Sequence, residues 1–165
     1  MTAGMTPGAA GRPADGLLHP VALLALVVLV VNDQVLKATW PGVVTGKLSD
    51  VAGLVVAPLV VQAAWEVGQW VAGRWSAPSA RVLAIAIVTV GVTFAAVQVW
   101  PPATDLYRGA LGVAQWPFRL LASLVTGTPR PSPVPVQTVA DAADLLALSA
   151  LAVTWWVGQR RVRSG

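Results

Sequence analysis

The sequence predicts an all-α integral membrane protein, built as a bundle of four transmembrane helices. Of its 165 residues, 56% are hydrophobic and only 11% are charged, whereas a soluble domain usually carries about 25% charged residues. The apolar residues, mostly Val, Ala and Leu, occur in blocks of roughly 20 residues, which is enough for a helix to cross a hydrocarbon core of about 30 Å. Because these blocks do not alternate between apolar and polar residues, they favour membrane helices over the strands of an outer-membrane barrel.

The first predicted span covers about residues 17–38 and follows a Gly- and Pro-rich tail, residues 1–16, which we expect to be disordered. A cleaved signal peptide is the alternative, with Arg12 as its basic region. Asp15 weakens that region, and VNDQVLKATW offers no small-x-small cleavage site after the apolar run. We therefore expect a retained helix that continues through the polar residues after the run.

The second predicted span, about residues 51–72, contains Pro58, which a membrane helix tolerates as a kink. Three polar residues follow at spacings of four and three, so they share one face of the helix. They are consistent either with a position near the lipid headgroups or with a helix–helix contact. These residues are Gln62, Glu66 and Gln69.

The third predicted span, about residues 82–100, is a run of 19 residues that contains no charged side chain, VLAIAIVTVGVTFAAVQVW. It is expected to stop at Pro101 and Pro102, because a proline disfavours the α conformation in the residue before it.

The longest interruption between apolar blocks is the loop of residues 103–137. Its aromatic and leucine residues around Trp116 and Phe118 are mixed with Pro117 and Arg119, which favours a helix that lies in the membrane interface. A fifth span is the alternative for this stretch. The prolines of TGTPRPSPVPVQ then predict an extended linker.

The fourth predicted span, about residues 139–158, ends in Trp155 and Trp156, which suit headgroup depth. A basic tail, residues 159–165, follows it, and residues 17–158 form a single transmembrane domain. Four spans place both termini on one side of the membrane together with six basic residues, against five on the other side. This bias favours cytoplasmic termini. The six are Arg12, Arg74, Arg81, Arg160, Arg161 and Arg163; the five are Lys37, Lys47, Arg108, Arg119 and Arg130.

A weak internal repeat relates the two halves of the chain. The second and fourth spans both open with an Asp-x-Ala-x-Leu-like stretch, at Asp50 and at Asp141. The first and third spans are both followed by an acid and a base three or four residues apart, a spacing that lets the two side chains meet on a helix. Two hairpins inserted the same way form a parallel repeat, an architecture known in transporters.

The repeat predicts a polar site at the outer face of the bundle, because ionisable groups at membrane depth are costly unless they are paired, hydrated or turned inward. Its oxygen ligands suit a hard cation, and a proton or a polar solute are the other candidate ligands; no cofactor is identifiable. Helix capping by Ser49, Asp50, Asp141 and Asp144, together with ion pairing, is the structural alternative. The candidate site comprises Asn32, Asp33, Lys37, Lys47, Ser49, Asp50, Asp105, Arg108, Asp141 and Asp144.

The stretch VNDQVLKATWPGVVTGKLSDVAGLVVAPL resembles a pattern of uncharacterised bacterial multi-pass membrane proteins. In such proteins Asn-Asp-x-x-Leu-Lys is followed by Thr-Gly-Lys-Leu-Ser-Asp-x-Ala-Gly-Leu and a more distant proline. In this chain the two segments are residues 32–37 and 45–54, with Pro58 beyond them. The Asp-Pro-Thr-Asp-Leu stretch of such proteins is matched only in part, because Ala142 and Ala143 replace Pro-Thr. The resemblance implies a location in a bacterial inner membrane and carries no assigned activity.

Several function classes are disfavoured by the composition. The chain has no cysteine and one histidine, His19, so it lacks the ligands of Fe–S, haem and His-based zinc sites. Its basic residues are scattered and not interleaved with aromatics, which argues against nucleic-acid binding.

The expected partner is the lipid bilayer, with a membrane-protein partner or a second copy of the chain as an addition. A non-catalytic assembly subunit is the main alternative function. The other is a lipid-processing enzyme that uses Asp50 with Asp141 or Asp144 as acid and base.

Overall fold

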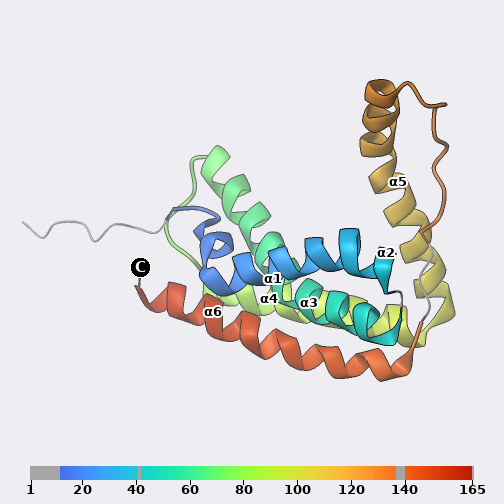
Figure 1. Cartoon of the computed structure of the whole chain (residues 1–165). Coiled ribbons are helices and arrows are strands. Elements are labelled where there is room, and N and C mark those ends of the chain that lie inside the picture. Colours follow the sequence, from blue (N-terminus) through green and yellow to red (C-terminus); the bar gives the residue numbers. More distant parts are fainter. Residues whose placement is uncertain (1–11, 41, 137–139, 165) are drawn as a thin grey trace, which may run out of the picture. The chain divides into compact units, whose positions relative to one another are not determined.

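The computed structural model describes residues 12–40, 42–136 and 140–164, and this part of the chain is helical and contains no strand (Figure 1). The predicted all-α class is thereby confirmed. A 3-10 turn η1, a π-helical turn η2 and a 3-10 helix η3 interrupt or extend the α-helices. The bounds are η1 Asp15–Leu18, α1 Pro20–Val31, η2 Asn32–Leu36, α2 Lys37–Thr39, α3 Val43–Val71, α4 Ala80–Val99, α5 Pro101–Thr126, η3 Ala142–Ala150 and α6 Leu151–Ser164.

Four helical segments are long and apolar enough to cross a membrane, as the sequence predicts. They are Pro20–Thr39, which joins α1, η2 and α2; α3; α4; and Ala142–Arg163, which joins η3 and α6. Their ends lie within a few residues of the predicted ends in most cases. The exception is the beginning of α3.

The second span begins eight residues earlier than the sequence predicts, at Val43 and not at residue 51. Gly42 precedes the helix, and the Thr45 hydroxyl satisfies its backbone by accepting from the Gly42 amide at 3.1 Å and donating to the Gly42 carbonyl at 2.9 Å. Ser49 and Asp50 therefore lie inside the helix, and the capping role considered for them is wrong. The polar residues of this segment resemble a loop in composition, but they form the first two turns of α3.

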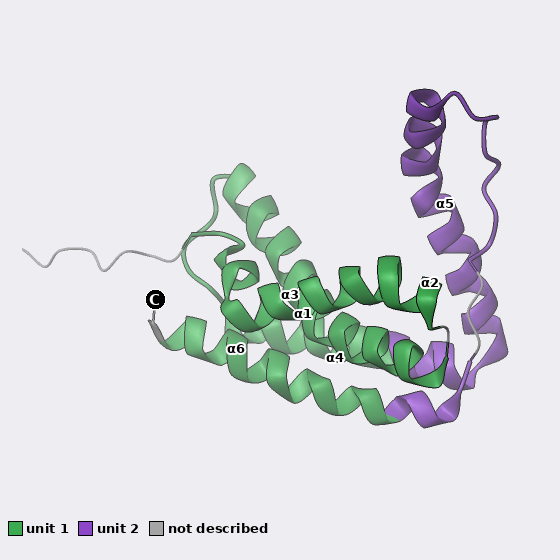
Figure 2. Ribbon diagram, viewed as in Figure 1, with its two compact units in different colours: residues 1–92, 146–165 green, residues 93–145 purple. Residues whose placement is uncertain are grey.

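The chain divides into two compact units (Figure 2). The first unit comprises residues 1–92 and 146–165. Its core holds one buried residue from each of α1, α3, α4 and α6, namely Ala22, Leu59, Leu83 and Val157. At Gly158 a Cβ atom would lie 2.4 Å from the Leu83 side chain, so any larger residue where α4 meets α6 would force this buried leucine to move.

A buried hydroxyl compensates for the proline inside α3. Pro58 has no N–H, so the carbonyl of Leu54 lacks its normal helical donor. Thr154 of α6 is fully buried, and its hydroxyl lies 3.1 Å from the carbonyl oxygens of both Leu54 and Val55. Two helices about 100 residues apart in sequence are thus joined at the point where α3 lacks its own hydrogen bond.

The second unit, residues 93–145, contains α5 and the proline-rich segment that follows it. The helix continues through Pro117 and ends at Gly127, and the chain then returns along it without helical structure. The Trp116 indole donates to the Pro131 carbonyl at 2.8 Å, and the Val136 amide donates to the Arg108 carbonyl at 3.1 Å. The extended segment therefore lies against one face of α5.

Parts of both predicted tails have defined structure. Residues 1–11 of the N-terminal tail lie outside the described residues, whereas residues 12–16 have defined contacts and Gly16 is buried. At the other end, α6 continues to Ser164, so most of the predicted basic tail is helical.

Candidate functional site

The predicted polar residues of the first unit form a connected chain of hydrogen bonds between η2 and α3. The Asn32 Nδ2 amide donates to the Thr45 carbonyl and to Ser49 Oγ, both at 2.7 Å. Ser49 in turn donates to Asp33 Oδ1 at 2.6 Å. The adjacent side chains Asn32 and Asp33 thus meet at one hydroxyl of the neighbouring helix.

The direction of this chain of hydrogen bonds is fixed by the Thr45 carbonyl. A carbonyl only accepts, so the Asn32 group that faces it must be the NH₂. Both hydrogens of that NH₂ are then used, and the hydroxyl hydrogen of Ser49 is left for Asp33. Asn32 is fully buried, and within the described part of the chain no donor reaches its Oδ1.

The backbone at this site is a π-helical turn, in which the Lys37 amide donates to the Asn32 carbonyl five residues earlier. Such turns inside α-helices are rare and occur frequently at functional sites. Lys37 also pairs with Asp33 Oδ1, with Nζ 2.7 Å away, and both side chains are 41% exposed. Lys47 and Asp50 lie on α3 near Ser49, in the same unit.

The remaining predicted site residues belong to the second unit. Arg108 Nη1 lies 3.2 Å from Asp105 Oδ1, as their spacing predicts. Asp141 accepts from the Ala143 amide at 2.9 Å, which is a capping contact at the beginning of η3. For Asp141 the capping alternative therefore describes its observed contact.

Gln98, which the sequence interpretation did not single out, joins α4 to the beginning of η3. It is largely buried, its Oε1 accepts from the Asp141 amide at 3.1 Å, and its Nε2 lies 3.4 Å from Asp144 Oδ2. An amide in an apolar span is the only sequence signal for this contact.

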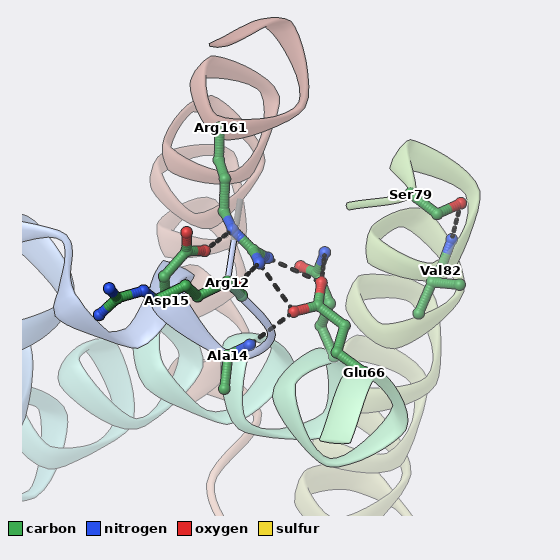
Figure 3. Close-up of polar contacts among 8 residues, drawn as sticks. Arg12, Ala14, Asp15, Glu66, Ser79, Val82 and Arg161 are labelled. Carbon is green, nitrogen blue, oxygen red and sulfur yellow. Dashed lines mark hydrogen bonds and ion pairs between the residues drawn. The ribbon is translucent and has the colours of Figure 1, made fainter. Parts of the chain in front are cut away.

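A second buried network, at the other end of α3, surrounds Glu66 (Figure 3). The Arg161 guanidinium forms two hydrogen bonds with its carboxylate, Nη1 to Oε1 at 2.7 Å and Nη2 to Oε2 at 2.8 Å. Gln62 Nε2 donates to Oε1 at 2.9 Å and the Ala14 amide to Oε2 at 2.8 Å. Asp15 forms an ion pair with Nε of the same arginine.

This network joins the segment around η1, α3 and α6 within the first unit, and the sequence did not predict it as a set. The side chain of Glu66 is only 2% exposed and that of Arg161 12%, so the pair is removed from solvent. The shared face of Gln62 and Glu66 is a helix–helix contact, the second of the two interpretations considered for it. Arg161 was assigned to membrane orientation alone, because its partner lies 95 residues away.

The chemistry available at these sites comes from oxygen atoms, amides and basic side chains. Among the described residues, no three His, Cys, Asp or Glu side chains gather closely enough to hold a metal ion. Fold and site together define a helical protein with four helices able to cross a membrane and buried polar networks between them. Compared with family models, curated proteins and solved structures, the chain has no match.

Proposed function

We propose that this chain is a multi-pass membrane protein that binds a monovalent hard cation, such as Na⁺, at the Asn32 network. The observation that supports the proposal is the Oδ1 atom of Asn32, a buried acceptor that no donor reaches within the described residues. A buried polar atom without a partner costs about 1–3 kcal/mol. A cation bound at this oxygen removes that cost.

The ligands at hand suit a monovalent ion better than a divalent one. The network offers one carboxylate, Asp33, with the neutral oxygens of Asn32 and Ser49. Oxygen ligands select hard cations, and transporters bind Na⁺ where helices depart from regular α geometry, as η2 does here. The proposed cation site consists of those residues of the predicted candidate site that lie in the first unit, and Lys47 and Asp50 lie near it.

The ammonium group of Lys37 indicates that the Asp33 carboxylate is a position where a positive charge binds. It lies 2.7 Å from Asp33 Oδ1 as part of a partly exposed ion pair, and such pairs contribute only about 0–1 kcal/mol. A free cation is therefore able to compete with Lys37 for the Asp33 carboxylate.

Thermal unfolding of the purified protein tests the proposal, in chloride salts of Na⁺, K⁺ and choline at equal ionic strength. A ligand present at a hundred times its dissociation constant stabilises by about 2.7 kcal/mol. We expect a higher melting temperature in Na⁺ or K⁺ than in choline for the native chain. The shift disappears in Asn32→Leu and remains in Gln98→Leu, a matched amide removal in the other unit. Equal melting temperatures in all three salts contradict the proposal.

The finer architecture is part of the same proposal: a four-helix bundle of two parallel hairpins in a bacterial inner membrane, with cytoplasmic termini. Its support is the pairing of Asp33 with Lys37 in one half and of Asp105 with Arg108 in the other. The two halves differ at the pair of residues that the repeat aligns. Asp50 lies inside α3, whereas Asp141 lies just before the beginning of η3. The resemblance to bacterial multi-pass proteins belongs to this proposal too.

An assembly subunit is the second candidate function, favoured by the α5 hairpin. The proline-rich segment lies against one face of α5, near Gly112 and Trp116. Three apolar side chains on one face of the helix, those of Leu106, Val113 and Leu124, are more than 60% exposed. This exposed face suits the lipid interface, as proposed for the loop, or a membrane-protein partner. Purification of the chain as a monomer without any companion protein would exclude the second candidate.

A further inference from the structure

A cavity of about 240 Å³ lies in the first unit where α3 ends and α4 begins. Its wall is formed by the last two turns of α3, the loop after them and the first turn of α4. The residues used below are Trp65, Glu66, Gln69, Arg74, Trp75 and Ser79.

The length of α3, together with two exposed tryptophans near its end, favours the depth of the lipid headgroups for this cavity. The helix has 29 residues, or about 43 Å at 1.5 Å per residue, which exceeds a hydrocarbon core of about 30 Å. Two tryptophans near this end, Trp65 and Trp70, are 55% and 59% exposed. Exposed tryptophans are typical of the interface between headgroups and acyl chains.

The position of Arg74 at the cavity is fixed by the way α3 ends. Gly73 has φ +67°, and its amide donates to the Trp70 carbonyl at 3.0 Å. The Arg74 amide donates to the Gln69 carbonyl at 2.8 Å. These two bonds are the Schellman arrangement, which closes a helix with a left-handed glycine.

Arg74 is the basic residue of the cavity wall, and the Glu66 carboxylate in the same wall is already hydrogen-bonded to other groups. Arg161, Gln62 and the Ala14 amide together supply four hydrogen bonds to the Glu66 carboxylate (Figure 3). Arg74 is exposed, and the described residues contain no ion pair to its guanidinium. The hydroxyl of Ser79 adds a further hydrogen-bonding group beside it.

We propose that this cavity binds the phosphate headgroup of an anionic phospholipid. Arg74 pairs with the phosphate, Ser79 hydrogen-bonds to it, and Trp65 and Trp75 pack against the glycerol. Exposed apolar side chains beside the cavity, including Val71, give the acyl chains a surface, which a soluble phosphate does not need. This site is separate from the Asn32 network and does not depend on its function.

Lipid retention by the purified full-length protein in detergent tests the site. The probes are dioleoyl phosphatidylglycerol, dioleoyl phosphatidylcholine and sn-glycerol 3-phosphate, and native mass spectrometry measures binding. We expect phosphatidylglycerol to be retained preferentially. Because an arginine–phosphate pair is charge-assisted, Arg74→Gln should weaken its binding at least about fivefold, and Arg74→Lys should weaken it less.

Three results would overturn the proposal. The first is unchanged retention of phosphatidylglycerol by Arg74→Gln. The second is equal retention of phosphatidylcholine by the native chain, and the third is equal binding of free glycerol phosphate, which would make the ligand soluble. Arg130→Gln, an exposed arginine in the proline-rich segment, is the matched control and should bind as the native chain does. Arg74→Gln should melt at the native temperature without lipid, because the side chain it changes is exposed.

Discussion

Thr154 shows how one residue corrects a defect that another creates. Its hydroxyl reaches the two α3 carbonyls before Pro58, one of which has no helical donor. We expect Thr154→Val, which keeps the shape and removes the donor, to lower the free energy of unfolding by about 1–2 kcal/mol. Thr154→Ser should retain most of the stability.

A double-mutant cycle identifies the cause of this loss. Pro58→Ala returns an N–H to α3, so the carbonyl of Leu54 regains a donor of its own. The cost of Thr154→Val should therefore be smaller in the Pro58→Ala background, as measured by unfolding in detergent mixtures. An equal cost in both backgrounds would contradict the role of Thr154 as a substitute donor for the Leu54 carbonyl.

At the scale of helices, Glu66 and Arg161 join α3 to α6 in a buried pair. Removing one partner leaves an uncompensated buried charge, which costs about 3–5 kcal/mol. We therefore expect Arg161→Met alone to destabilise the protein more than the double change Arg161→Met with Glu66→Gln. Thermal unfolding of both single variants and the double variant measures the difference, and an additive result would contradict a coupled pair.

The contact between α5 and the proline-rich segment depends on Gly112. A Cβ atom there would lie 2.4 Å from the Val134 carbonyl oxygen, whereas a Cβ atom at Gly109 meets nothing within 4 Å. We expect Gly112→Ala to separate the segment from the helix. Exchange of the Val136 amide, which donates to Arg108 at 3.1 Å, should then accelerate by about tenfold.

Gly109→Ala is the matched control for this change, because it adds the same methyl group to the same helix in open space. Its Val136 amide should exchange at the native rate. Equal acceleration in both variants would mean that the effect arises within α5 and not at its contact with the segment.

The sequence predicts helices better than it predicts their contacts. Blocks of apolar residues identify the four spans because length and composition are local properties. The polar segment at Thr45 and Ser49 resembles a loop in composition, whereas in the structure its hydrogen bonds to Asn32 hold it as part of α3. Likewise, Glu66 and Arg161 are 95 residues apart, and no local pattern couples such distant positions. Among the candidate site residues, the spacing of Asp33 and Lys37 predicted their contact, whereas the buried Oδ1 of Asn32 follows from tertiary packing.

For the whole molecule, the proposed topology makes a prediction about the two sides of the membrane. The chain has no cysteine, so a single introduced cysteine is the only thiol of the chain that a maleimide can label. With cytoplasmic termini and four spans, Ser132→Cys should react with a membrane-impermeant maleimide in intact cells, and Ser76→Cys only after permeabilisation. Labelling of Ser76→Cys alone would reverse the orientation, and equal labelling of both would contradict four spans.

Binding of a cation at Asn32 is the central claim about the whole molecule, and equilibrium binding of radioactive sodium to the purified protein tests it most directly. We expect saturation at one ion per chain, with binding lost in Asn32→Leu and kept in Gln98→Leu. No saturable binding by the native chain, or undiminished binding by Asn32→Leu, would contradict the claim.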